Sequence, residues 1–125
     1  MSKQLSQEAL QKLESARNVW FSSVRPDGRP HLTPVWFVWH AEKFYVGIDP
    51  HSVKSRNIRH NPRVALALED GTNPVICEGI ARLVELPLSE PLLRAFFEKY
   101  EWDLLKEEQY NQVVEITPQK WLGSV

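Results

Sequence analysis

The sequence predicts a mainly β protein, an antiparallel sheet or barrel with flanking helices. Between residues 18 and 69 the apolar residues are β-branched or aromatic, and turn-forming residues interrupt them every eight to twelve positions. This pattern is typical of antiparallel strands. Residues 6–17 and 90–100 instead place apolar side chains three and four positions apart, which is helical spacing. A β region is therefore expected between short amphipathic helices.

The length of the chain fits one domain with one core. It has 125 residues, of which 42% are hydrophobic. A chain of this length buries roughly two thirds of the surface that its unfolded form exposes, so it needs no metal or disulfide to fold. Cys77 is the only cysteine and cannot form an internal disulfide, which suits a compartment that is either reducing or indifferent to thiol redox state. We expect residues 1–125 to form a single domain.

Charge and hydropathy exclude several classes of function. The net charge of -1 argues against a general nucleic-acid or membrane binder. No apolar run approaches the roughly 20 residues of a membrane span, and the polar first residues do not resemble a signal peptide. An oligonucleotide-binding barrel is disfavoured because the aromatic and basic residues cluster separately instead of alternating on one strand face. We expect a cytoplasmic protein.

Three strands are expected in the first half of the chain, at residues 19–25, 31–40 and 43–49. Between the first two, Asp27 and Gly28 supply the positive φ values that a tight hairpin requires. The second strand is unusual because neither face is polar: its apolar residues are Leu32, Val35, Trp36, Phe37, Val38 and Trp39. One face can fill a barrel interior, while the other needs a ligand, a partner subunit or a helix to cover it.

The second half of the chain is expected to add two helical segments and three strands. Residues 52–60 predict one or two helical turns that end before Asn61-Pro62, and Ser89 opens a helix at residues 90–100. Residues 101–108 either continue this helix or form a loop. The three strands are expected at residues 63–69, 75–85 and 112–117.

A local charge imbalance is the strongest functional signal. Residues 51–63 hold four Lys or Arg residues, two of the four histidines and no carboxylate, in a slightly acidic chain. A helix that begins near Ser52 would add free backbone N–H groups and a favourable dipole, with the Ser52 hydroxyl as a donor and Lys54 as counter-charge. The sequence predicts an anion site here. The alternative is a solvated helix face that binds nothing specific.

The apolar strand and the basic segment together suit a ligand with two different ends. A flat hydrophobic slot beside a phosphate site would accept a molecule that joins an aromatic ring system to a phosphate, such as flavin mononucleotide (FMN). The alternative for Trp36 and Trp39 is ordinary packing in a core or a dimer interface.

No catalytic or metal-binding motif accompanies this site. The sequence contains no nucleophile motif and no glycine-rich phosphate loop. Its four histidines, His31, His40, His51 and His60, match no zinc spacing. We therefore expect no bound metal, and we assign no catalytic side chain.

Three segments of the chain resemble the pyridoxamine 5'-phosphate oxidase-like flavin-binding split barrels. They read VWFSSVRPDGRPHLTPVWF at residues 19–37, FYV at 44–46 and SVKSRNIRHNPRV at 52–64. The resemblance covers about residues 8–121. It implies a six-stranded antiparallel split barrel of the FMN-binding type, dimeric, with a flavin in each of two clefts at the subunit interface.

The resemblance also implies which residues bind the flavin. In that family the backbone of the second strand runs along the flavin ring, and the turn before the short helix holds the phosphate. His31 lies near the position where the longer oxidases carry an arginine, and Asn73 near the place where the partner chain reaches the flavin. The implied cofactor-binding residues are His31, Thr33, Pro34, Val35, Trp36, Ser52, Val53, Lys54, Arg56 and Asn73.

Two departures from the family pattern narrow the implied activity. Many relatives carry an arginine two residues before the lysine, where this chain has Ser52, and residues 119–125 lack the Arg-x-His substrate clamp of true pyridoxamine phosphate oxidases. Vitamin B6 oxidation is therefore not expected. The resemblance implies a homodimeric FMN-dependent oxidoreductase acting on a small molecule, in which the flavin accepts or donates hydride and needs no catalytic acid or base.

Three alternatives stay open. Some short relatives use the deazaflavin coenzyme F-420, and others bind haem. A protein of this family can also carry FMN or haem for sensing or storage without turning anything over.

Overall fold

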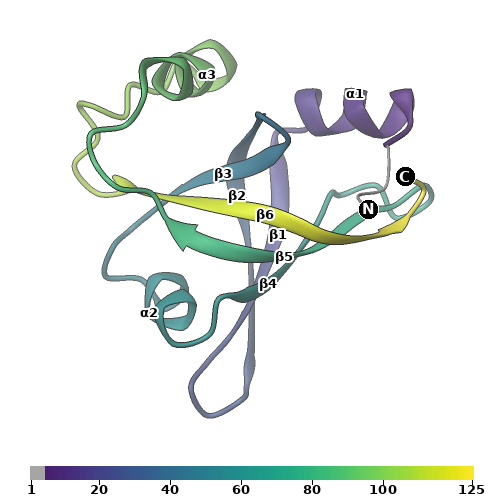
Figure 1. The fold of residues 1–125 in the computed structure, drawn as a ribbon, viewed down its shortest axis with the longest axis horizontal. Coiled ribbons are helices and arrows are strands. Elements are labelled where there is room, and N and C mark those ends of the chain that lie inside the picture. The colour runs from purple at the N-terminus through teal and green to yellow at the C-terminus, as the bar shows by residue number, and fades with distance from the viewer. Residues whose placement is uncertain (1–4) are drawn as a thin grey trace.

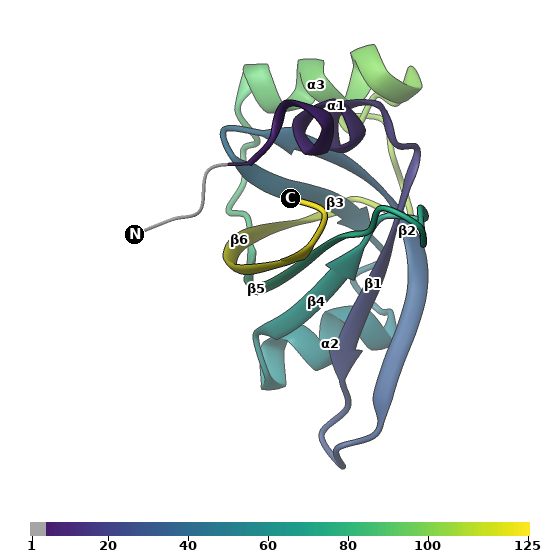
Figure 2. The ribbon, with the colours of Figure 1, turned by 90° about the vertical axis from the view of Figure 1, so that its right-hand side faces the viewer.

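The computed structural model describes residues 5–125 and forms a closed antiparallel barrel of six strands with three helices around it (Figures 1 and 2). The strand order around the barrel is β1-β2-β3-β6-β5-β4. The strands are β1 (Asn18–Val24), β2 (Pro30–His40), β3 (Lys43–Ile48), β4 (Arg63–Ala67), β5 (Val75–Leu83) and β6 (Gln112–Gly123). The helices are α1 (Gln7–Ser15), α2 (Val53–His60) and α3 (Glu90–Tyr100). The mainly β fold with flanking helices is confirmed.

Each helix begins at a serine that caps its N-terminus. Ser6, Ser52 and Ser89 have extended backbone angles, and each hydroxyl accepts a hydrogen bond from the N–H three residues later. Such caps satisfy backbone donors that have no partner inside the helix. Helix α3 ends at Glu101, whose backbone is left-handed with φ 56°. Residues 101–108 therefore form a loop and do not continue the helix.

Two apolar clusters hold the helices to the barrel. The first fills the barrel and includes fully buried Phe21, Phe37 and Phe44. The second lies outside it, where Leu92 and Phe96 of α3 pack on the outer face of β2, β3 and β6; its barrel members are Val38, Tyr45 and Val113. Helix α3 thus covers part of the outer face of the barrel.

The last strand is longer than the sequence predicts. The strand expected at residues 112–117 continues as β6 to Gly123, past Pro118, although proline has no N–H for the ladder. The register shifts between Glu78 and Gly79 of β5, opposite Pro118. A Cβ on Gly79 would lie 2.8 Å from the Thr117 carbonyl oxygen. Because Gly79 has no Cβ, the backbones of β5 and β6 can approach closely there, and β6 stays paired with β5 beyond Pro118.

The β1–β2 hairpin differs in one detail from its prediction. Gly28 has a positive φ of 92°, whereas Asp27 is not among the residues with positive φ. Asp27 instead accepts a hydrogen bond from the Arg29 N–H and pairs with the Arg29 guanidinium. The hairpin projects beyond the barrel at the end where α2 lies, and α1 lies at the opposite end (Figures 1 and 2).

Candidate functional site

Strand β2 presents one apolar face to solvent. Along residues 31–37 its side chains alternate between the barrel interior, which takes Val35 and Phe37, and the outside, which takes Leu32, Pro34 and Trp36. On the outside Leu32 is 60% exposed and Trp36 is 44% exposed. The prediction that one face of this strand fills the barrel is confirmed. The other face is open, except where α3 reaches Trp36.

Neighbouring strands extend this open face. Trp20 of β1 lies directly opposite both Pro34 of β2 and Ala67 of β4, and directly opposed residues share one face of a sheet. The register continues from Ala67 to Ile76 and from Ile76 to Leu122. We call this surface the outer apolar face; it comprises Trp20, Leu32, Pro34, Trp36, Ala67, Ile76 and Leu122. A contiguous apolar face of this kind calls for a ligand or a partner.

The start of α2 keeps two free donors. The Ser52 hydroxyl donates to the Asp49 carbonyl at 2.6 Å and accepts from the Ser55 N–H at 3.2 Å. In this structure the hydroxyl is thus engaged within its own turn, and a Ser52 side-chain hydrogen bond to an anion stays a prediction. The N–H groups of Val53 and Lys54 have no partner among residues 5–125. They sit at the positive end of the helix dipole, as the sequence predicts.

Positive charge gathers beside these donors. Lys54 is half-buried, and its burial lowers the pKa of its amine, although Asp49 acts in the opposite direction. His31 also has a lowered pKa, first because it is partly buried and then because Lys54 and Arg25 are near. The Nδ1 atom of His31 and the hydroxyl of Thr33 are buried without a partner among the described residues. We call His31, Thr33 and Lys54, with the free N–H groups of α2, the cationic corner. It lacks an anion.

Asn57 fixes this corner to the barrel, and sequence reasoning missed it. Asn57 is fully buried, and its side-chain amide donates to the Ser23 hydroxyl at 3.0 Å. Ser23 lies opposite His31 in the β1–β2 ladder. The Asn57 amide oxygen accepts hydrogen bonds only, so it cannot contact a phosphoryl oxygen. Through its amide N–H group, Asn57 holds α2 against β1. The one sequence signal for this role is a polar residue next to apolar Ile58 in the predicted helix.

The remaining predicted residues do not all join the corner. Val53 is 37% exposed and Arg56 is exposed on α2. Asn73 lies in the turn between β4 and β5, where its N–H donates to Asp70 and its carbonyl accepts from Lys12. This turn is at the α1 end of the barrel, opposite α2. Within one chain, the structure therefore does not bring Asn73 to the corner.

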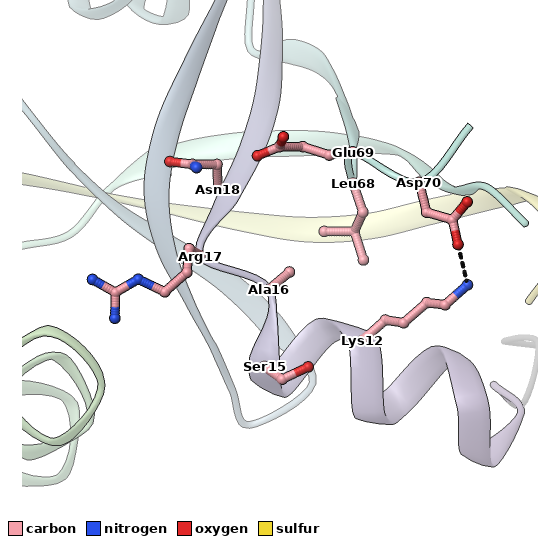
Figure 3. A pocket seen from close by; sticks show the side chains of 8 residues that line it. All are labelled: Lys12, Ser15, Ala16, Arg17, Asn18, Leu68, Glu69 and Asp70. Carbon is pink, nitrogen blue, oxygen red and sulfur yellow. Dashed lines mark hydrogen bonds and ion pairs between the residues drawn. The ribbon is translucent and has the colours of Figure 1, made fainter. Parts of the chain in front are cut away.

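An open groove lies between α1 and the end of β4 (Figure 3). Lys12 and Asp70 form an ion pair on one side of it, and the Arg17 side chain points away from that pair. The groove contains none of the predicted site residues. Its lining consists of Lys12, Ser15, Ala16, Arg17, Asn18, Leu68, Glu69 and Asp70.

Three further features bear on function. None of the helices in residues 5–125 is long and apolar enough to cross a membrane. The same residues contain no group of three or more His, Cys, Asp or Glu side chains that could hold a metal ion. Cys77 is buried, and its burial raises the pKa of its thiol to about 12, so it is a poor nucleophile.

Comparison with known families decides the relationship. The family model for pyridoxamine 5'-phosphate oxidase matches residues 5–124. The chain belongs to this family. No curated protein sequence matches it.

Solved structures share the fold across nearly the whole chain. The haem storage protein HutZ from Vibrio cholerae is 22% identical, with a TM-score of 0.79, over 97% of this chain and 95% of that one. An F420 reductase is 22% identical, with a TM-score of 0.73, over 98% of each chain. A conserved hypothetical protein from Mycobacterium tuberculosis is 28% identical, with a TM-score of 0.76, over 96% of this chain and 88% of that one. Solved proteins that share this fold are therefore named for different cofactors.

We predict that His31 makes the protein without bound ligand less stable in acid. Since the folded state lowers the pKa of His31 below its ordinary value of 6.5, the unfolded chain binds the proton more readily. The free energy of unfolding therefore keeps the full contribution of neutral His31 above about pH 6.5 and loses it as the pH drops below that value. The drop in melting temperature between pH 7.5 and pH 5.5 should be smaller in His31→Gln than in the unchanged protein.

His60→Gln is the matched control, because His60 is exposed at the end of α2. It should follow the unchanged protein at both pH values. Equal drops in all three proteins would contradict the prediction.

Proposed function

We propose that the protein is an FMN-binding oxidoreductase that works as a homodimer on a small molecule. The observation that carries this proposal is the cationic corner, where partly buried donors of α2 and β2 come together on the strand whose outer face is apolar and open. A phosphate joined to a planar heterocycle matches both parts. We further propose a cytoplasmic location, as the lone cysteine and the composition predict.

The residues of the corner fit a phosphoryl group. Its oxygens accept hydrogen bonds, and the corner offers the Lys54 amine, the N–H groups of Val53 and Lys54, and the hydroxyl of Thr33. Protonated or suitably tautomeric, His31 adds a further donor. Phosphate at a helix N-terminus is a favourable arrangement in its own right. Arg56 would contribute long-range attraction from the exposed side of α2.

The backbone of residues 33–36 would lie along the ring of the flavin. Pro34 and Trp36 face outward there, whereas Thr33 and Val35 turn inward, so the outward pair would meet the ring with side chains. Bound FMN supplies hydride transfer; the chain supplies orientation and exclusion of water. In a dimer, Asn73 would come from the other subunit, because within one chain it lies at the far end of the barrel.

The first experiment identifies the ligand. We expect the purified protein to be yellow, to release a compound with the mass of FMN, and to lose its flavin absorbance when a reduced nicotinamide is added. Flavin that is bound but never reduced by any donor would make the protein a carrier. Release of coenzyme F-420 or haem would contradict the choice of FMN.

Removing the charge of Lys54 should weaken FMN binding. A charge-assisted hydrogen bond is worth about 1.5–3 kcal/mol, so the dissociation constant of Lys54→Ala should rise about 10- to 150-fold. Isothermal titration of FMN into the apoprotein measures this change. Arg59→Ala is the control: Arg59 is an exposed cation in the last turn of the same helix, and its loss should change the affinity by less than about threefold. Equal affinity in the Lys54 variant and the unchanged protein would refute the phosphate assignment.

The outer apolar face supports the dimer. Seven apolar side chains from five strands face outward there, and large apolar patches on soluble proteins mark interaction sites. A second copy of the chain would bury this face and close the slot beside β2. Flavin occupancy should therefore depend on dimer formation.

Leu32→Glu should break the dimer without unfolding the subunit. Leu32 is 60% exposed in one chain, so the change costs little in the subunit but buries a charge in an interface. Light scattering should report half the mass of the unchanged protein, and FMN content should fall. Leu105→Glu is the matched control, because Leu105 is 77% exposed in the loop after α3 and should keep the mass unchanged. A dimer that survives in Leu32→Glu would place the interface elsewhere.

A further inference from the structure

Trp36 has one covered and one open aromatic face. The Tyr100 ring stacks on it with centroids 4.5 Å apart and planes 5° from parallel. The Trp102 ring lies near the indole, with centroids 5.8 Å apart and planes at 82°. The indole nevertheless remains 44% exposed. The open face is therefore free to stack against a planar group.

Two cations adjoin this aromatic cluster without an anionic partner. The Arg17 guanidinium carbon lies 4.8 Å from the Tyr100 centroid and 5.6 Å from that of Trp36. The Lys99 amine lies 3.9 Å from the Phe37 ring centroid and donates to the Phe37 carbonyl. Neither cation belongs to an ion pair in the part of the chain that the structure describes. Burial, and then the charge of Arg17, lower the pKa of Lys99 to about 8. A bound anion would stabilise the charged form of both side chains.

The cluster is held rigidly by the Tyr100 hydroxyl. This oxygen accepts the Phe37 N–H at 2.9 Å and lies 2.7 Å and 2.8 Å from the carbonyl oxygens of Phe37 and Arg17, to either of which it can donate. One side chain thus joins α3 to β2 and to the start of β1. Tyr100 is a positioning residue: it fixes the plane of Trp36 and the backbone from which Arg17 extends.

We propose that the open face of Trp36 and the guanidinium of Arg17 form a subsite for a planar aromatic substrate that carries a carboxylate or another anionic group. The inference rests on the proposed function, which runs the flavin ring along β2 as far as Trp36, and it names the class of substrate that would meet that ring. The indole supplies stacking, and Arg17 selects for negative charge. A cationic ligand of the same shape is disfavoured by both Arg17 and Lys99.

This subsite is separate from the cationic corner. Trp36 is five residues along β2 from His31, and at about 3.3 Å per residue of strand that places the two about 17 Å apart. Trp36 stacks on Tyr100, the last residue of α3, whereas His31 lies near Lys54 of α2. The two sites can therefore be tested independently.

The test compares an anionic and a neutral aromatic probe. We would titrate 2-naphthoate and 2-naphthylmethanol into the full-length protein by calorimetry, with and without added FMN. Naphthoate should bind more tightly than the alcohol. Arg17→Gln should weaken naphthoate at least about tenfold and leave the alcohol unchanged. Arg29→Gln, which removes an exposed hairpin arginine, should leave both probes unchanged.

A second pair of variants tests the stacking face. Trp36→Leu should weaken the binding of both probes. Trp36→Phe should restore most of the affinity, because phenylalanine keeps a flat ring. Circular dichroism checks that each variant is folded. Naphthoate that does not bind, or that binds Arg17→Gln or Trp36→Leu as well as the unchanged protein, overturns the subsite. FMN content is measured in the same samples. Intact FMN binding without a naphthoate preference overturns only this inference, whereas Arg17-dependent naphthoate binding without FMN overturns only the proposed function.

Discussion

The candidate site depends on one constraint: β2 is apolar on both faces, and its own chain covers the outer face only where α3 packs on it. Inside, Val35 and Phe37 belong to the barrel core, so the strand cannot turn over without emptying it. Outside, Leu32 and Trp36 stay substantially exposed. Each Å² of apolar surface left in water forgoes about 25 cal/mol, which favours any ligand or subunit that covers this face. The scaffold and the proposed binding wall are thus the same strand.

The position of the cationic corner relative to β2 depends on packing between α2 and β1 and not on a sequence motif. Asn57 and Ser23 tie α2 to β1, so the free N–H groups at the start of α2 keep a fixed position relative to β2. The Ser52 hydroxyl closes the turn before α2 by donating a hydrogen bond to the Asp49 carbonyl. Lys54 is then the side chain that supplies charge, and its partial burial makes that charge more effective than an exposed one, because water screens it less.

Local patterns predicted the helices and strands well, because caps, turn residues and apolar spacing act over a few positions. Ser6, Ser52 and Ser89 begin the helices in the structure as they do in the sequence interpretation. Contacts between distant residues could not be predicted in the same way. The register shift opposite Gly79 lets β6 continue past Pro118, the Ser52 hydroxyl is used within its own turn, and Tyr100 reaches Phe37 across 63 positions of sequence. Spacing along the chain carries no information about such pairs. Family resemblance supplied the six-stranded barrel.

The most direct measurement is the position of the phosphoryl group in a crystal structure of the protein with FMN. We expect its oxygens within hydrogen-bond distance of the Lys54 amine and of the N–H groups of Val53 and Lys54, with the flavin ring along the backbone of residues 33–36. A phosphoryl group bound away from α2, or an outer apolar face packed against a second subunit with no room for a ring, would contradict this arrangement.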